Sequence, residues 1–273
     1  MFDPKSNKYP YPEQTDKHYL PVNKDRGIIF DENYPYVDTS KSFLRKQKFI
    51  RFMLNLLVFF ISRIRMGLRV KGRENIKNNK ELLKRGAVSI CNHVHMFDYL
   101  SIMYGVRHFK TYLLSWDKNV NGESGPLVRM VGGIPIPEND NDATHAFNEA
   151  IKKLLDDGNI LQIYAEGSMW EYYAPIRPFK IGAASLAVNH NKPIIPLAFS
   201  YRKAGWFRRK VFKQEALFNL NVGEPIFANP DLEKAEQIKD LTIRAHQAVC
   251  CLAGFEGNNI YEDLYNNSKR VDY

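Results

Sequence analysis

The chain has 273 residues and a mass of 31.7 kDa, which is enough to bury a substantial hydrophobic core. With 44% apolar and 25% charged residues it cannot be largely disordered, collagen-like or a coiled coil, and no run of about 18 apolar residues predicts a membrane span. Three cysteines, two of them adjacent, give no disulfide framework, and the first residues hold no apolar signal core. We therefore expect a reducing, cytosolic setting.

The net charge of +9 is concentrated in residues 41–85, which contain 14 basic and 2 acidic residues. Residues 1–40, in front of this window, are rich in Pro, Tyr, Asp and Lys without a sustained period, so they predict an irregular N-terminal arm. Nucleic acid is not expected as a partner, because no zinc-finger, RNP or basic-zipper motif accompanies the basic residues.

The basic window also holds the most apolar run of the chain, residues 49–64, which is interrupted by Arg51, Asn55, Ser62 and Arg63. This run is shorter than the roughly 20 residues that a spanning helix needs. Together with its basic flanks it predicts an amphipathic helix over residues 41–70 that lies in the interface of an anionic membrane. A core helix with solvated basic ends is the alternative.

Residues 71–254 alternate between short apolar runs and amphipathic segments, which is typical of an α/β fold. A helix is expected after Asp142, its predicted N-cap, and is expected to stop at Gly158. We also expect a strand pair in residues 210–227, a last helix opening at Asn229 and Pro230, and a C-terminal tail over residues 255–273. The other predicted strands cover residues 87–91, 111–115, 159–165 and 193–201.

His93 and Asp98 follow the first of these strands and are separated by five residues. In a helix this spacing leaves the two side chains about 140° apart, and in a strand it places them on opposite faces. They meet only if the chain turns between them, with His93 at a strand end and Asp98 in the first turn of a helix. The carboxylate would then orient the imidazole, which predicts a general base. A buried histidine beside a helix-capping aspartate is the plainer alternative.

His95 raises a second possibility, because His93, His95 and Asp98 together have the ligand types of a metal site in a metal-dependent hydrolase. Such a site needs more ligands than this segment supplies, and the other histidines are scattered along the chain. We therefore do not expect a bound metal, although a metal-dependent hydrolase stays open as a different class of function.

Two further segments give the histidine its context. Asn92, His93 and Asp98, followed after about 73 residues by Glu166-Gly167-Ser168, resemble the motifs of the glycerolipid acyltransferase family, of the lysophosphatidic acid acyltransferase type. The resemblance covers roughly residues 70–225. Further matches to its blocks are Phe179, Lys180 and Gly182, the segment Gly132-Gly133-Ile134-Pro135-Ile136, and the strand Pro193-Ile194-Ile195-Pro196.

The resemblance implies a single mixed-sheet acyltransferase domain, flanked by helices, over residues 71–254. It also implies transfer of an acyl chain from acyl-CoA or acyl carrier protein to a hydroxyl of a lysophospholipid, without a cofactor. His93 would take the acceptor proton while Asp98 holds the ring, and Glu166, Gly167 and Ser168 would shape the acceptor pocket. The enzyme would work at the cytoplasmic face of a membrane.

The departures from the family pattern concern the acceptor. Family members commonly carry arginines for the acceptor phosphate where this chain has Pro137-Glu138 and Met169. Arg177 and Lys180 are expected to supply positive charge instead, with Arg129 or Lys118 as further candidates, and Glu138 is expected to repel a phosphomonoester. A glycolipid or another lysolipid is therefore the alternative acceptor, and a non-catalytic membrane-binding homologue is the more remote one.

Two aromatic segments carry no firm assignment. Trp170, Tyr172 and Tyr173 predict either an aromatic rim of the pocket or ordinary loop packing. Residues 201–210 mix basic and aromatic side chains directly after the fourth strand. They suit a second membrane contact, a site for CoA phosphates, a site for an acidic carrier protein, or a solvated turn.

Overall fold

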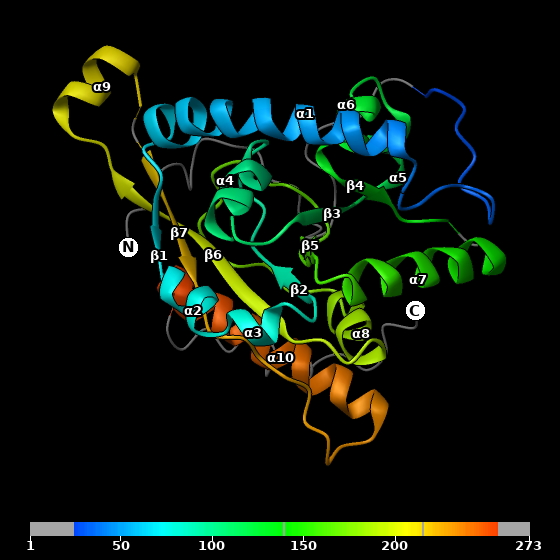
Figure 1. Cartoon of the computed structure of the whole chain (residues 1–273). Helices are drawn as coiled ribbons and strands as arrows, with labels where there is room; N and C mark the ends of the chain where they lie inside the picture. The colour runs from blue at the N-terminus through cyan, green and yellow to red at the C-terminus, as the bar shows by residue number, and fades with distance from the viewer. Residues whose placement is uncertain (1–24, 139, 215, 256–273) are drawn as a thin grey trace.

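A seven-stranded sheet in the order β1-β7-β6-β2-β5-β3-β4 runs through the middle of the described part of the molecule (Figure 1). The structure is a computed structural model and describes residues 25–138, 140–214 and 216–255. Neighbouring strands are parallel except β6 and β7, so the expected mixed sheet is confirmed. The strands are β1 (Arg69–Lys71), β2 (Ala87–Ile90), β3 (Thr111–Ser115), β4 (Gly133–Pro135), β5 (Ile160–Ile163), β6 (Ile194–Lys203) and β7 (Ala216–Val222).

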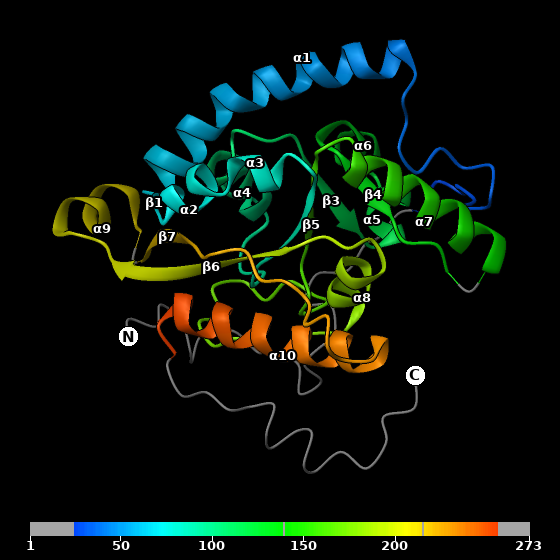
Figure 2. The same ribbon diagram turned by 60° about the horizontal axis from the view of Figure 1, so that its bottom comes forward.

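Helices cover both faces of the sheet (Figure 2). Helices α7, α8 and α10 pack on one face around Val88, Leu161 and Ala198, while α2 to α4 pack on the other around Ile195 and Leu197. Because successive side chains of a strand point to opposite faces, residues 194 to 199 of β6 serve both cores in alternation. These helices are α2 (Arg73–Asn78), α3 (Lys80–Leu83), α4 (Asp98–Gly105), α7 (Asn141–Asp156), α8 (Gly182–Asn189) and α10 (Lys234–Ala253). Two further short helices are α5 (Asp117–Asn121) and α6 (Gly125–Val131).

A long N-terminal helix lies across α4 and α6, outside these layers (Figures 1 and 2). It comprises α1 (Lys41–Val58) and the π-helical segment η1 (Phe59–Arg65), and it ends before residue 70 because Arg69–Lys71 pair with β7. The inner side is anchored by Arg51, whose Nη2 donates to the carbonyl oxygens of Val131 (3.0 Å) and Thr111, and by the buried Leu54.

The outer side of this helix is apolar and exposed. Its seven large apolar side chains are 41% to 63% exposed. Counted from the first of them, they follow the i, i+3, i+4, i+7, i+8 spacing that places side chains on one face of a helix. A core helix with solvated ends does not have such a face. Within the part of the chain that the structure describes, no helix is both long and apolar enough to cross a bilayer. The side chains of this outer stripe are Phe49, Phe52, Met53, Leu56, Leu57, Phe60 and Ile64.

The described part of the N-terminal arm, residues 25–39, is irregular and packs on the body of the protein. Tyr36 is 2% exposed and its ring meets Phe147 edge-on at 5.6 Å. Arg129 fixes the same segment by donating to the carbonyl oxygens of Pro35 (2.6 Å) and Tyr36 (2.8 Å). Residues 1–24 and nearly all of the predicted tail, residues 256–273, lie outside the described residues.

Three expectations about individual elements need correction. Asp140, not Asp142, caps α7, because its side chain accepts hydrogen bonds from the amides of residues 142 and 143. The last helix begins at Lys234, since Asn229 is used in a turn with Asp231. In place of a strand pair over residues 210–227 there is one strand, β7, which follows a short helix, α9 (Trp206–Phe212).

Candidate active site

The turn between β2 and α4 brings His93 and Asp98 together, as the spacing predicts. Nδ1 of His93 lies 3.1 Å from Oδ2 of Asp98, whose side chain is fully buried. The same oxygen accepts hydrogen bonds from the amides of Val94 (2.7 Å) and His95 (2.9 Å). Asp98 therefore holds both the turn and the imidazole, and leaves Nε2 of His93 as the ring nitrogen available to a substrate.

The backbone of His93 is fixed as firmly as its side chain. Its amide donates to Oε2 of Glu166 (3.1 Å), and its carbonyl oxygen accepts from the amide of Trp170 (3.0 Å). Next to it, Asn92 is fully buried and exchanges two hydrogen bonds with the backbone of Phe199 in β6. The Asn-His pair thus joins the end of β2 to two neighbouring segments, and this fixes where the imidazole points.

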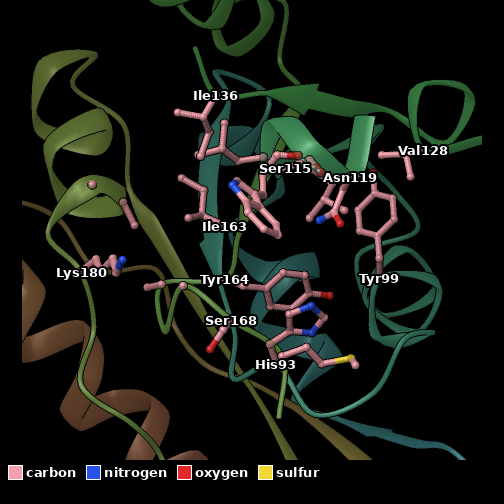
Figure 3. A pocket seen from close by; sticks show the side chains of 18 of the residues that line it. His93, Tyr99, Ser115, Asn119, Val128, Ile136, Ile163, Tyr164, Ser168 and Lys180 are labelled. Carbon is pink, nitrogen blue, oxygen red and sulfur yellow. Dashed lines mark hydrogen bonds between the residues drawn. The ribbon is translucent and has the colours of Figure 1, made fainter. Parts of the chain in front are cut away.

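Tyr164, a residue that the motifs do not single out, stacks on the imidazole. The ring centroids of His93 and Tyr164 are 3.8 Å apart and the rings are 8° from parallel (Figure 3). Burial raises the pKa of the Tyr164 hydroxyl well above its usual value, so the phenol stays neutral. A signal was present in the sequence, because this tyrosine follows β5 directly and the ends of adjacent parallel strands meet at one sheet edge.

Glu166 and Arg177 do not line the cavity, which corrects their predicted contact with the acceptor. Oε2 of Glu166 lies 2.8 Å from Nη2 of Arg177, both side chains are 2% exposed, and Oε1 accepts from the Arg177 amide (2.9 Å). Arg177 also donates to Oγ (2.6 Å) and to the carbonyl oxygen of Ser168, and its guanidinium lies 4.4 Å from the centre of the Trp170 ring. The pair braces the loop after β5 and the amide of His93.

A cavity of about 1000 Å³ opens beside His93 and reaches between the sheet and helices α5 to α8 (Figure 3). Its size is at the upper end for small-molecule sites. Gly167, Ser168 and Lys180, the predicted acceptor-binding residues, are part of its lining. Gly167 has a φ of 79°, and a Cβ there would lie 2.9 Å from Cε of Lys180, so the lysine side chain crosses directly over the glycine. Much of the remaining lining is apolar and includes Leu113, Leu114, Val128, Ile136, Phe147, Ile163, Ala183 and Leu186.

Charge is sparse in this cavity. Among the described residues that line it, Lys180 is the single cation and Glu123, on the segment after α5, the single carboxylate. Arg129 is engaged with the N-terminal arm, and Lys118 lies 5.0 Å from the ring of Trp116 without lining the cavity. Glu138 is not part of the lining either, so the expected repulsion of phosphate by Glu138 is not supported.

The aromatic segment after Ser168 packs within the protein and does not form a rim. Trp170 is 4% exposed, and Tyr172 lies against Phe218 and Tyr201. Neither residue lines the cavity, and nor does Tyr173. The amides of Trp170 and Tyr172 donate to the carbonyl oxygens of residues 93 and 94, so this loop is a second support of the histidine turn.

His95 points away from His93 into this aromatic cluster. Its Nδ1 accepts from the amide of Phe97 (3.1 Å), its ring meets Tyr172 edge-on at 5.7 Å, and burial lowers its pKa. Among the residues that the structure describes, no three His, Cys, Asp or Glu side chains gather closely enough to hold a metal ion. His93 instead pairs with one buried carboxylate, that of Asp98.

Comparison with known proteins identifies a matching family model and a similar fold. A family model described as Acyltransferase matches residues 67–200, which contain β2, His93, Asp98 and the Glu-Gly-Ser segment. The fold is similar to the crystal structure of the 1-acyl-sn-glycerophosphate (LPA) acyltransferase PlsC from Thermotoga maritima, with a TM-score of 0.52 and 17% sequence identity over 80% of this chain and 85% of that one. No curated protein matches the sequence.

Proposed function

Because the chain belongs to the acyltransferase family, we propose that it is an O-acyltransferase that acylates a hydroxyl of a lysophospholipid at a membrane surface. The single observation that carries the proposal is the contact of the buried Asp98 with His93, which lines a large, mostly apolar cavity. A large apolar cavity suits an acyl chain, and a histidine in its lining suits a proton transfer.

In the proposed reaction His93 removes the proton of the acceptor hydroxyl through Nε2. The oxygen attacks the thioester carbonyl of acyl-CoA or acyl carrier protein, and the tetrahedral intermediate collapses with loss of the thiolate. His93 returns its proton to that thiolate, so the products are the ester and the free thiol. Asp98 keeps Nδ1 protonated and stabilises the imidazolium in between. The donor supplies the activated acyl group, so the reaction needs no resident cofactor or metal.

The acceptor headgroup has two candidates. The first is the phosphomonoester of a 1-acylglycerol-3-phosphate, with Lys180 beside Gly167 as its cationic partner. The second is an acceptor without a phosphomonoester, such as a glycolipid or another lysolipid. The presence of one lysine and one carboxylate, Glu123, in the cavity favours the second, since a dianionic phosphate is normally held by several cations or by a bidentate arginine.

We further propose that the N-terminal helix docks the enzyme on the cytoplasmic face of a membrane. The outer stripe of α1 would enter the interface, while basic residues of the 41–85 window face anionic headgroups. The three free cysteines are in keeping with a reducing compartment.

The test is a product analysis with purified full-length protein. Acyl-CoA and acyl carrier protein thioesters are each combined with lysophosphatidic acid, two phosphodiester lysolipids and a monoacylated glycolipid, and the diacylated products are measured by mass spectrometry. Transfer that requires His93 supports the proposal, and the preferred acceptor decides between the two headgroup classes. If no donor and acceptor pair gives a product above that of His93→Ala, the proposed function is wrong.

A further inference from the structure

The helix α9 forms part of the connection between β6 and β7 and presents apolar side chains to solvent. Trp206 is 66% exposed and Phe207 61%, and further along the helix Val211 and Phe212 are also more than half exposed. None of its seven residues is buried. Four large apolar side chains on about two turns of helix are unusual on a free surface and mark an interaction site.

This helix is held in place beside the end of the N-terminal helix. Nη1 of Arg208 donates to the carbonyl oxygen of Ile64 (2.7 Å) and to Oε1 of Gln214 (3.2 Å), while Gln214 donates to the carbonyl oxygen of Arg65. Both ribbon views place α9 next to the C-terminal end of α1–η1 (Figures 1 and 2). The helix α9 therefore lies beside Ile64, the last member of the outer stripe of α1.

The positive charge around α9 favours an anionic partner for its exposed side chains. Residues 201–214 contain six basic and no acidic residues, and the neighbouring N-terminal helix lies in the most basic window of the chain. A second copy of this chain would bring two positive faces together. An anionic membrane matches the charge, and it also accepts tryptophan and phenylalanine side chains at headgroup level.

We propose that α9 is a second lipid-contacting element, which places Trp206, Phe207 and Phe212 in the interface of an anionic membrane beside the outer stripe of α1. Lys210, whose Nζ lies 5.0 Å from the centre of the Trp206 ring, and Arg209 then face the headgroups. Two separate contacts fix the orientation of the enzyme on the bilayer, which one amphipathic helix alone does not. This inference rests on the proposed membrane docking but not on the acyl-transfer chemistry.

The test is flotation of the full-length protein with vesicles of phosphatidylcholine containing 30% or no phosphatidylglycerol, at low and moderate salt. Combined Trp206→Ser, Phe207→Ser, Val211→Ser and Phe212→Ser substitutions are expected to lower the vesicle partition coefficient by about tenfold or more. The matched control carries Ile29→Ser and Phe227→Ser, which remove exposed apolar side chains far from α9 and are expected to leave binding unchanged. Thermal unfolding checks that both variants keep their fold.

A second measurement locates the contact directly. Trp206 is the most exposed tryptophan, whereas Trp116 lines the cavity and Trp170 is buried. Lipids brominated near the headgroup are expected to quench a fluorescence component that Trp206→Phe removes. Unchanged vesicle binding of the fourfold variant, or absence of quenching at Trp206, overturns the inference while leaving the proposed reaction intact.

Two other outcomes also overturn the inference, and the first of them identifies a rival partner. If the fourfold variant binds vesicles normally but has a raised KM for acyl-CoA or acyl carrier protein in detergent, α9 belongs to the donor site and the inference is wrong. If the wild-type chain does not float with anionic vesicles at all, both the docking and this inference fail. Transfer to a short-chain, water-soluble acceptor then still tests the reaction separately.

Discussion

The carboxylate of Glu166 lies 2.8 Å from the guanidinium of Arg177, and both side chains are 2% exposed. This buried pair replaces the acceptor contact that the motif suggests for Glu166. Glu166 also accepts a hydrogen bond from the amide of His93. The pair therefore links the irregular loop that carries Arg177 to the backbone of the proposed base. Both residues are therefore positioning residues.

Removing one member of this pair is expected to destabilise the protein by about 3–5 kcal/mol, because it leaves an uncompensated buried charge. Arg177→Met and Glu166→Met each test this by urea unfolding. The double variant is expected to lose less than the sum of the two single losses, since it leaves no charge behind. Lys84→Met is the control, because it breaks an exposed pair of similar length with Glu81 and should not measurably change the unfolding free energy. Additive losses in the double variant would contradict the pairing.

The His93–Asp98 contact predicts the pattern of activity loss. His93→Ala is expected to lower kcat by about 10²- to 10⁴-fold, the usual contribution of a general base. Asp98→Asn still offers an oxygen to the amides of residues 94 and 95 but no longer stabilises an imidazolium, so kcat should fall by about 10²-fold or more with a small change in KM.

His95→Gln is the matched control for this pair of variants. It is two residues from His93, yet its ring belongs to the aromatic cluster and does not line the cavity. It should retain most of the activity. Equal losses in His93→Ala and His95→Gln would contradict the assignment of His93 as the base.

The sequence predicts the parts of this fold that a period or a motif encodes. Strands β3 and β6 are apolar, β-prone runs and the helix α7 shows a full hydrophobic period, and their predicted positions agree with the structure within a few residues. The strands β1 and β4 are three residues long, too short for any period to appear. The segment of α9 holds three aromatic, one β-branched and three basic residues, and this composition alone does not indicate that its apolar side chains face outwards.

The site was predictable where chain geometry restricts it. His93 and Asp98 can meet in one way only, through a turn between a strand and a helix, and the structure has this turn. Arg177 follows Glu166 by eleven residues within an irregular loop, and no periodicity determines whether such a side chain points into the cavity or beneath it. The departures from the family motif predict an unusual acceptor region, and this stays a prediction. They did not identify which residues compensate, because this depends on tertiary packing.

The cavity predicts how acyl-chain length is limited. Ala183 on α8 lines the cavity, whereas Ala187, one turn later on the same helix, is buried without lining it. Ala183→Leu fills part of the cavity and is expected to shift the preference to acyl donors several carbons shorter. Ala187→Leu is the control: it has a similar overpacking cost of about 1–3 kcal/mol and should leave the preference unchanged. The measurement is kcat/KM over a series of acyl-CoA chain lengths. An identical series for both variants would place the acyl chain elsewhere.

Burial of His246 predicts a loss of stability in mild acid. This histidine of α10 is fully buried between Phe179 and Cys250, and burial lowers its pKa from 6.5 to about 4. Between these two values the unfolded chain binds a proton at this site and the folded chain does not, so stability rises with pH and is lost as the pH falls. Relative to pH 7, the contribution of His246 at pH 5 is a loss on the order of 2 kcal/mol. His246→Leu removes the titrating group and should unfold with a smaller difference between pH 7 and pH 5 in urea. An equal difference in the wild type and His246→Leu would show that the acid sensitivity arises from other groups.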